Sequence, residues 1–230
     1  MLLKIEDLHT NYGAIHALKG ISLEVNEGEI VCLIGSNGAG KTTLVNSIVG
    51  IVKSSSGTIT FDGKDITHVP AHAMTKAGIG ISPEGREVFP ELTVEENLRI
   101  GAFVVKDENK IKESYERVYE LFPRLKERIT QQAGTLSGGE QQKLIMMRWF
   151  MSPARIFIFN EPTQSIDIPS KIDVYNMFND LILKGSSILI FSSNLEELMG
   201  ICDRVIFIKD GTISGEISYS ESPSSVQNLI

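Results

Sequence analysis

Apolar residues along this chain recur with two periods, one typical of strands and one typical of helices. Weak alternation near the start, clean alternation at 21–25 and short runs rich in β-branched residues predict strands. The predicted strands are Leu2–Leu8, Ile21–Val25, Glu29–Ile34, Gly57–Phe61, Arg155–Asn160, Ser187–Ser192, Arg204–Ile208 and Thr212–Ile217. The Asp210-Gly211 pair favours a tight turn between the last two strands.

Apolar positions three and four residues apart predict helices between these strands. The predicted helices are Lys41–Val49, Thr93–Gly101, Glu108–Phe122, Ser137–Met151, Ile172–Leu183 and Leu195–Cys202. Thr93 and Glu96 have the spacing of a capping box at the start of the second helix. The third helix carries its own apolar stripe among charges, which indicates a helical insert over about 88–153.

Strands that alternate with helices, and that are apolar throughout, indicate an α/β fold with a parallel sheet covered on both faces. A length of 230 residues corresponds to one or two domains. We expect a single domain over 1–230, with a Ser-rich tail at about 218–230 that frays.

Composition and charge exclude several classes of protein. Hydrophobic residues make up 42% of the chain, enough to build a core, so disorder of the bulk is excluded. The net charge of -7 argues against a nucleic-acid partner. Cys32 and Cys202 have no metal-type spacing and are expected to be reduced thiols. The start carries acidic residues instead of a signal-peptide core, and no apolar run reaches the roughly 18 residues of a spanning helix, so we expect a soluble protein.

A glycine-rich segment between the third strand and the first helix predicts a nucleotide site. It fits the pattern G-x-x-x-x-G-K-[ST], and its residues are Gly35, Ser36, Asn37, Gly38, Ala39, Gly40, Lys41 and Thr42, followed by Thr43. The glycines allow backbone N–H groups to converge on phosphate oxygens at a helix N-terminus. Lys41 is expected to reach the β- and γ-phosphates, and the Thr42 hydroxyl to contact Mg²⁺.

A second glycine pair precedes the helix at 137–151 and is another candidate anion-binding terminus. Its residues are Ser137, Gly138, Gly139 and Glu140. Because it lies far along the chain from the first glycine loop, it suggests two chains that sandwich a nucleotide. Ser137 and Glu140 also have capping-box spacing, and the two interpretations are compatible.

With LSGGEQQ at 136–142, the chain resembles the ATP-binding cassette proteins over nearly its whole length. The resemblance implies a P-loop NTPase core with a mostly parallel sheet, an N-terminal antiparallel β subdomain and a helical insert, with ATP and Mg²⁺ as cofactors. Tyr12 resembles the aromatic residue that stacks on adenine. Asp167, in Ser165-Ile166-Asp167, resembles the D-loop residue near the nucleotide.

The segments NYGAIHAL, VPAH, PEGREVF and ELTVEENL are similar to those of the ATPases of branched-chain amino acid importers. From about Ser165 onward, the chain is more similar to the second cassette of tandem sugar-importer ATPases. The resemblance implies a second cassette and integral-membrane permease subunits as partners. It also implies a cytoplasmic location, peripheral on the inner face of the membrane.

Four residues are expected to carry the hydrolytic chemistry. Glu161, after an apolar strand, is the candidate that polarises the attacking water. Glu84 stands where most of the family has Gln, and its carboxylate can still reach Mg²⁺ through water. Asn160 stands where the family has a metal-side Asp, and Asn194 where it has a His that contacts the γ-phosphate. An amide retains an oxygen or a donor at these places but carries no charge.

Three functions follow from these features. The first is an importer ATPase, which the resemblance assigns to branched-chain amino acids, with a sugar-importer cassette as the alternative. The second is a cassette that dimerises on ATP but hydrolyses poorly because of Asn160 and Asn194. The third, a soluble cassette that acts on ribosomes or DNA-repair complexes, is disfavoured by the acidic balance and the importer-like segments. The histidines show no ligand spacing and are expected to be structural or at the surface: His9, His16, His68 and His72.

Overall fold

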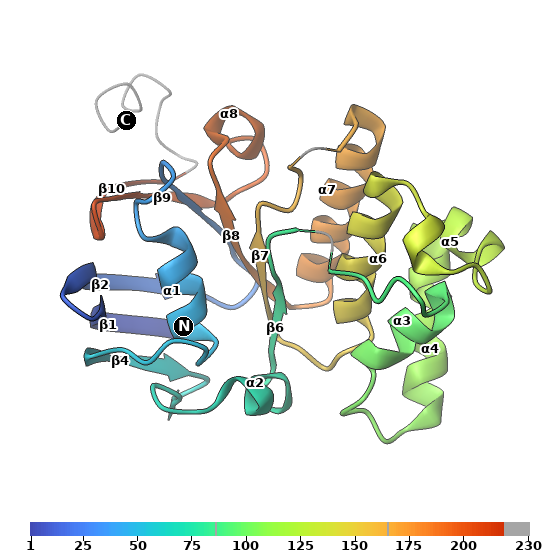
Figure 1. The fold of residues 1–230 in the computed structure, drawn as a ribbon, viewed down its shortest axis with the longest axis horizontal. Helices are drawn as coiled ribbons and strands as arrows, with labels where there is room; N and C mark the ends of the chain where they lie inside the picture. The colour runs from blue at the N-terminus through green and yellow to red at the C-terminus, as the bar shows by residue number, and fades with distance from the viewer. Residues whose placement is uncertain (86, 165, 219–230) are drawn as a thin grey trace.

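The computed structural model describes residues 1–85, 87–164 and 166–218 and contains two sheets (Figure 1). The antiparallel sheet has the order β2-β1-β4-β5, and the second sheet has the order β10-β9-β3-β8-β7-β6. The strands are β1 (Leu3–Tyr12), β2 (Ile15–Val25), β3 (Ile30–Ile34), β4 (Ser56–Phe61), β5 (Lys64–Asp65), β6 (Ile79–Ser82), β7 (Ile156–Asn160), β8 (Ser187–Ser192), β9 (Arg204–Lys209) and β10 (Thr212–Ser218). In the second sheet, β10 is antiparallel to β9 and the other pairs are parallel. The expected α/β class is confirmed.

The helices between residues 94 and 183 form the end of the molecule opposite the antiparallel sheet, whereas the helix after β3 packs near that sheet (Figure 1). The helices are α1 (Lys41–Ile48), α2 (Ala71–Ala77), α3 (Val94–Gly101), α4 (Glu108–Leu121), α5 (Pro123–Glu127), the 3-10 turn η1 (Ala133–Thr135), α6 (Gly138–Phe150), α7 (Ile168–Leu183) and α8 (Leu195–Leu198). Among the described residues, no helix combines the length and the apolar character needed to span a membrane.

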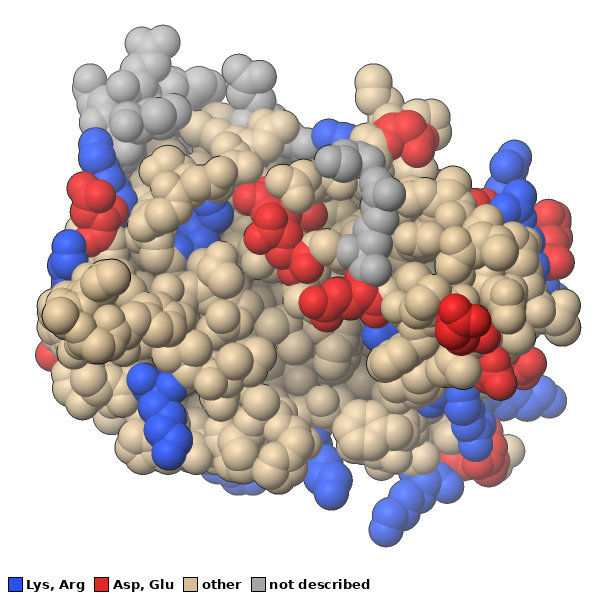
Figure 2. Space-filling view, viewed as in Figure 1, with Lys and Arg blue, Asp and Glu red and all other residues tan. Residues whose placement is uncertain are grey.

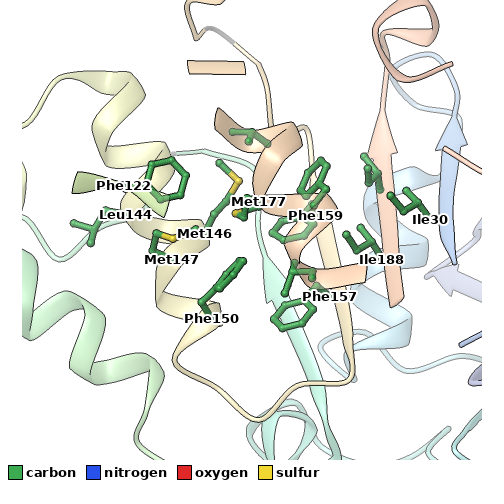
Figure 3. Close-up of a cluster of buried hydrophobic side chains, with 14 of the residues drawn as sticks. Ile30, Phe122, Leu144, Met146, Met147, Phe150, Phe157, Phe159, Met177 and Ile188 are labelled. Atoms are coloured by element: carbon green, nitrogen blue, oxygen red, sulfur yellow. The ribbon is translucent and has the colours of Figure 1, made fainter. Parts of the chain in front are cut away.

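The parallel strands bury side chains on both faces, as their unbroken apolar sequences predict. In β7, Phe157 and Phe159 point to the cluster shared with the helical end, while Ile156 and Ile158 point to the cluster shared with α1 and the antiparallel sheet. Phe157 faces Phe150 of α6, with ring centroids 6.3 Å apart, and Figure 3 shows Phe159 beside Met177 of the helix at 168–183. The parallel sheet therefore joins both halves through one continuous set of strands.

Three of the described elements differ from the expected ones. Helix α7 begins at Ile168, four residues earlier than predicted, because the Asp167 side chain accepts a hydrogen bond from Ser170 N–H. Helix α8 ends at Leu198 instead of Cys202. Strand β6 was not predicted, since Gly80 interrupts its pattern; a Cβ there would lie 3.2 Å from the Phe157 ring. The expected frayed tail falls almost wholly outside the described residues.

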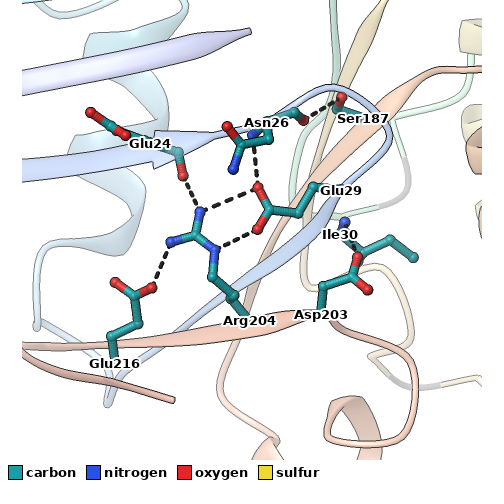
Figure 4. Close-up of polar contacts among 8 residues, drawn as sticks. All are labelled: Glu24, Asn26, Glu29, Ile30, Ser187, Asp203, Arg204 and Glu216. Carbon is teal, nitrogen blue, oxygen red and sulfur yellow. Dashed lines mark hydrogen bonds and ion pairs between the residues drawn. The ribbon is translucent and has the colours of Figure 1, made fainter. Parts of the chain in front are cut away.

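Arg204 of β9 ties the two sheets together (Figure 4). Its guanidinium bonds the Glu29 carboxylate before β3, the Glu24 carbonyl on β2 and the Glu216 carboxylate on β10. Burial alone would raise the pKa of Glu29, but the hydrogen bonds from Arg204 and from Asn26 outweigh it and hold this pKa below its ordinary value. This charged junction fixes the antiparallel sheet beside the strand that leads into the glycine loop.

Candidate nucleotide-binding and catalytic site

The glycine loop at 35–40 connects β3 to α1, and close packing explains two of its glycines. A Cβ at Gly35 would lie 2.6 Å from the side chain and carbonyl of Ile208. Gly40 has φ 110°, and a Cβ there would lie 3.3 Å from the Ala17 carbonyl. Side chains at these places would force the loop away from β9 and β2. The loop therefore stays packed on β9 and β2, with Ser36 to Gly38 exposed beside the N-terminus of α1.

Lys41, the first residue of α1, is almost fully buried. Its Nζ donates to the carbonyl oxygens of Gly35 and Ser36 and lies 4.0 Å from Oε1 of Glu161. A buried ammonium group needs such partners, because desolvation of an unpaired charge is costly. A bound phosphate group would offer Lys41 a stronger anionic partner than these carbonyls.

A pocket of about 720 Å³ opens beside this loop. Its lining residues are Ile15, His16, Ala17, Lys19, Ser36, Asn37, Gly38, Gly40, Lys41, Thr42, Thr43, Glu84, Asn160, Glu161, Gln164 and Asp210. Ten of the residues expected at the site are among them, and of the glycine-lysine motif only Gly35 and Ala39 do not line the pocket. Figure 2 shows acidic side chains gathered near the middle of one face, with basic side chains mostly toward its rim. The pocket is large enough for a small-molecule ligand.

Glu161 follows β7 directly and has a positive φ of 48°, which is unusual for a residue with a side chain. Its N–H donates to the Phe191 carbonyl (2.8 Å), and this bond to β8 holds the turn. Its Oε2 accepts a hydrogen bond from the Ser192 hydroxyl (3.3 Å), which in turn accepts one from Asn194 N–H (3.1 Å). Strain of this kind is found where a side chain must be aimed. Asn194 itself is exposed and does not line the pocket, but Ser192 links its backbone to Glu161.

Oxygen donors suited to Mg²⁺ lie around the same pocket: the Thr42 hydroxyl, the Asn160 amide and the carboxylates of Glu84 and Glu161. Within the described ranges, no cluster of three or more His, Cys, Asp or Glu side chains could hold a metal by itself. Mg²⁺ usually keeps several waters and is held by one or two carboxylates together with substrate phosphates. The residues present therefore fit an Mg²⁺ that arrives with a nucleotide.

The second glycine pair lies outside this pocket, at the N-terminus of α6. Ser137 and Glu140 form a complete capping box: Ser137 N–H donates to Glu140 Oε2 (2.9 Å), and Glu140 N–H donates to Ser137 Oγ (3.3 Å). Gly138 begins the helix, and a Cβ on Gly139 would lie 3.3 Å from Oδ1 of Asp167. The α6 terminus and the start of α7 therefore lie side by side, and neither reaches the pocket of its own chain.

Two ionisable groups at this second location have perturbed pKa values. The side-chain and backbone hydrogen bonds from Ser170 hold the pKa of Asp167 below its ordinary value. Burial alone would raise the pKa of Glu140, but hydrogen bonds from Ser137 and the charge of Arg128 outweigh it and lower this pKa. Both carboxylates are therefore ionised near neutral pH and stabilise the two adjoining helix N-termini.

Several expected residues are near the pocket without lining it, and several lining residues were not expected. Tyr12 is half-exposed at the end of β1 and is paired with Ile15 across the hairpin. Ala39 is buried and accepts a hydrogen bond from Gly211 N–H. His16, predicted to be structural or at the surface, is exposed and also lines the pocket. The other unexpected lining residues are Ile15, Ala17, Lys19, Gln164 and Asp210. These lining residues come from segments that are far apart in the sequence. Only two sequence patterns pointed to any of them, the segment NYGAIHAL and the Asp210-Gly211 turn.

Comparison with known proteins places this geometry in a family. The family described as ABC transporter matches residues 18–164. The branched-chain amino acid transport ATP-binding protein BraG of Pseudomonas aeruginosa is 38% identical over 92% of this chain and 91% of its own length. The ribose import ATP-binding protein RbsA 2 of Streptomyces coelicolor is 32% identical over 96% of this chain, which spans only 44% of that relative's length.

Solved structures agree in fold. The ADP conformation of an ATP-binding cassette of an ABC transporter has a TM-score of 0.85 and 27% identity, covering 99% of this chain and 93% of its own. The expected P-loop core is thereby confirmed, together with its antiparallel β sheet and helical part. The phosphate-loop geometry, the family match over 18–164 and these relatives agree, and the chain belongs to the ABC transporter family as an ATPase cassette.

Proposed function

We propose that this cassette binds and hydrolyses ATP to drive import of branched-chain amino acids through a membrane permease. The observation that carries this proposal is the convergence of the glycine loop, Lys41 and Glu161 on one pocket. The importer class rests on the 38% identity with a branched-chain amino acid transport protein over nearly both full lengths. The sugar-import relatives are similar over a smaller share of their own length.

Different residues of the pocket would bind the phosphates, the Mg²⁺ and the adenine. Backbone N–H groups of 36–40 and the N-terminus of α1 hold the phosphates, and Lys41 leaves its carbonyl partners to contact the terminal phosphates. Bound Mg²⁺ would neutralise developing charge, held by Thr42 with Glu84 and Asn160. Tyr12 would stack on the adenine.

Glu161 would orient and deprotonate the attacking water. Its carboxylate is largely shielded from solvent, and the Ser192 hydroxyl holds Oε2. The other oxygen, Oε1, lies 4.0 Å from Lys41 Nζ and would accept a proton once Lys41 has moved to the phosphates. In a head-to-tail dimer, the α6 N-terminus of the partner cassette (Ser137 to Glu140) and its Asp167 would close the pocket from the other side. This explains why these residues lie together on one chain and yet outside its own pocket.

The expected partners are a second cassette and permease subunits, which would hold this chain at the inner face of the membrane. Reconstitution in proteoliposomes with a branched-chain amino acid permease and its binding protein tests the proposal. We expect ATP hydrolysis to rise when this binding protein carries leucine, and to stay at the basal rate when the cassette is reconstituted instead with a ribose permease and its ribose-loaded binding protein. The reverse pattern would assign the cassette to sugar import.

A second candidate function is favoured by Asn160 and Asn194. Asn160 is buried in the pocket wall and has an amide at the position where the ATP-binding cassette proteins normally have a carboxylate. Such a cassette would bind Mg-ATP and dimerise but turn over slowly, because loss of one preorganised catalytic group costs on the order of 10²–10³-fold in rate. With a complete partner cassette, it would still lend Ser137 to Glu140 and Asp167 to that partner's pocket.

The double change Asn160→Asp with Asn194→His tests this candidate. If Asn160 and Asn194 impair hydrolysis, the double change raises the steady-state rate at least about tenfold. This recovers part of the 10²–10³-fold loss in rate expected for a missing catalytic group. Parental hydrolysis at about 1 s⁻¹ or more, unaffected by the double change, would show that the two asparagines are tolerated. The control Asn109→Asp, on the exposed side of α4, should leave the rate unchanged.

A further inference from the structure

Three side chains form a hydrogen-bonded chain on the outward face of β1 and β2. Asp7 Oδ1 is 3.1 Å from Nε2 of His9, and Nδ1 of His9 is 3.0 Å from Nε2 of His16. The two imidazole rings lie edge to edge, with centroids 5.2 Å apart and planes inclined by 25°. Asp7 has a positive φ of 47°, and a Cβ on Gly20 would lie 2.9 Å from its carboxylate. The Asp7 carboxylate therefore lies next to Gly20 of β2, although its side chain is 81% exposed.

The far end of this chain reaches the nucleotide pocket. His16 lines the pocket, and Ala17, the next residue, packs its carbonyl against Gly40 of the phosphate loop and Gly211. Lys19 N–H donates to the Gly211 carbonyl (2.8 Å), and Gly211 N–H donates to the Ala39 carbonyl (2.9 Å). These backbone contacts lock the start of β2 onto the phosphate loop, so His16 is held beside it.

The hydrogen-bond pattern determines which nitrogen carries each proton. When both rings are neutral, His9 donates from Nε2 to Asp7, so its Nδ1 accepts and Nε2 of His16 donates. This leaves Nδ1 of His16 as an acceptor, which repels an anionic oxygen. One added proton converts Nδ1 of His16 into a donor, and Asp7 stabilises the resulting positive charge through His9.

The charges around the pocket indicate that a protonated histidine would change its electrostatics. The pocket is lined by two lysines and three carboxylates, although its expected ligand is a polyanion: Lys19, Lys41, Glu84, Glu161 and Asp210. On β4, the residue opposite His9 is the neutral Ser56. Lys19 on β2 is paired with His9 across the strands, and Asp7 on β1 is the carboxylate that contacts it. A protonated imidazole would balance the excess of carboxylates among the lining side chains.

We propose that His16 contacts the bound nucleotide, positioned by His9 and Asp7, and that protonation of this histidine pair strengthens the binding of the phosphates. The inference rests on the nucleotide site proposed above. Affinity is therefore high when the pair is protonated and falls when rising pH removes that proton. Binding near neutral pH also takes up protons, because the ligand favours the protonated pair.

Calorimetry with the Mg²⁺ complex of adenylyl imidodiphosphate, a slowly hydrolysed ATP analogue, tests this on the full chain. We compare the parent with His16→Gln, His9→Gln and the control His72→Gln, which lies on α2 outside the pocket. The phosphates of the analogue also change protonation with pH, but they do so equally with all four proteins. The ratio of parent affinity to variant affinity therefore reports only the contribution of the replaced imidazole. Buffers of different ionisation enthalpy report proton uptake.

At about pH 5.5, we expect the parent to bind about tenfold more tightly than His16→Gln, which is the size of one charge-assisted contact. At about pH 8.5, we expect the two proteins to bind nearly equally. His9→Gln should show a weaker pH dependence, and His72→Gln should match the parent. A constant ratio of parent to His16→Gln at every pH, with equal proton uptake, overturns the role of His16. Failure of the parent to bind at any pH overturns the nucleotide site itself.

Discussion

Replacing Arg204 with methionine removes the guanidinium group that joins the two sheets and keeps much of the apolar stem. Arg204 donates to the Glu24 carbonyl (2.5 Å), to Glu216 (2.5 Å) and to both oxygens of Glu29. The side chains of Arg204 and Glu29 are only 19% and 13% exposed. After the change, Glu29 keeps the hydrogen bond from Asn26 N–H (2.7 Å) but loses its cation.

The energetic cost lies between two limits. Breaking a fully buried ion pair costs about 3–5 kcal/mol, and an exposed pair is worth about 0–1 kcal/mol. Because Arg204 and Glu29 are mostly but not fully buried, we expect a loss of about 2–4 kcal/mol in the free energy of unfolding. For a chain of this length, this lowers Tm by about 5–15 °C.

The pH dependence has a definite sign. The pKa of Glu29 is below its ordinary value in the folded protein, so the pair contributes fully above the unfolded-state pKa of about 4.3 and is lost as pH falls through the folded pKa. In Arg204→Met, the guanidinium no longer opposes burial, so the pKa of Glu29 rises. The stability difference between parent and variant is therefore largest near neutral pH and shrinks on acidification through the pKa range of Glu29.

Thermal unfolding followed by circular dichroism between about pH 7 and about pH 4 measures both effects. Arg99→Met is the matched control, because Arg99 pairs with Glu108 at the surface, where the side chains are 51% and 73% exposed. The second change Glu29→Gln in Arg204→Met should restore part of the stability, since it removes the unpaired charge. Equal Tm values for Arg204→Met and Arg99→Met, at every pH, would refute this reasoning.

Three further changes test other parts of the structure. Lys41→Ala should weaken Mg-ATP binding tenfold or more, roughly 1.5–3 kcal/mol for a charge-assisted contact, and unchanged calorimetric affinity would remove Lys41 from its role. Tyr12→Ala should cost about 1–3 kcal/mol of adenine stacking; if ATP and GTP bind this variant as they bind the parent, the stacking assignment is wrong. Asn97→Ala should lower stability in urea by about 3–4 kcal/mol, because fully buried Asn97 bonds both Phe89 N–H and Arg148 (2.9 Å each). A loss below about 1 kcal/mol would contradict the buried-network explanation.

The parallel core could be predicted from sequence because its signals are local. Runs such as Arg155–Asn160 are apolar at every position, and a run bounded by turns indicates a strand with both faces buried. The capping box of Thr93 with Glu96 was predicted for the same reason, and both of its hydrogen bonds are present. Strand β6 was missed because Gly80 interrupts its apolar pattern. Glycine is required there by the close approach of Phe157, which only the folded structure shows.

The candidate site shows the same division between local and distant signals. The glycine loop and Lys41 carry a contiguous motif, so they could be predicted without a structure. His16 could not be assigned, because its role depends on a contact between β2, the phosphate loop and the turn at Gly211. Isolated histidines have no spacing signal, and only the fold shows that Asp7 and His9 support this one.

Hydrolysis of Mg-ATP in the pocket beside Lys41, with Glu161 acting on the water, is tested most directly by steady-state phosphate release. The purified chain should release phosphate from Mg-ATP, and Glu161→Gln should slow release by about a hundredfold or more, the size of a lost general base. Glu161→Gln should still bind the nucleotide with parental affinity in calorimetry. Equal phosphate release by the parent and Glu161→Gln, at matched nucleotide binding, would contradict the assignment of this pocket as the hydrolytic site.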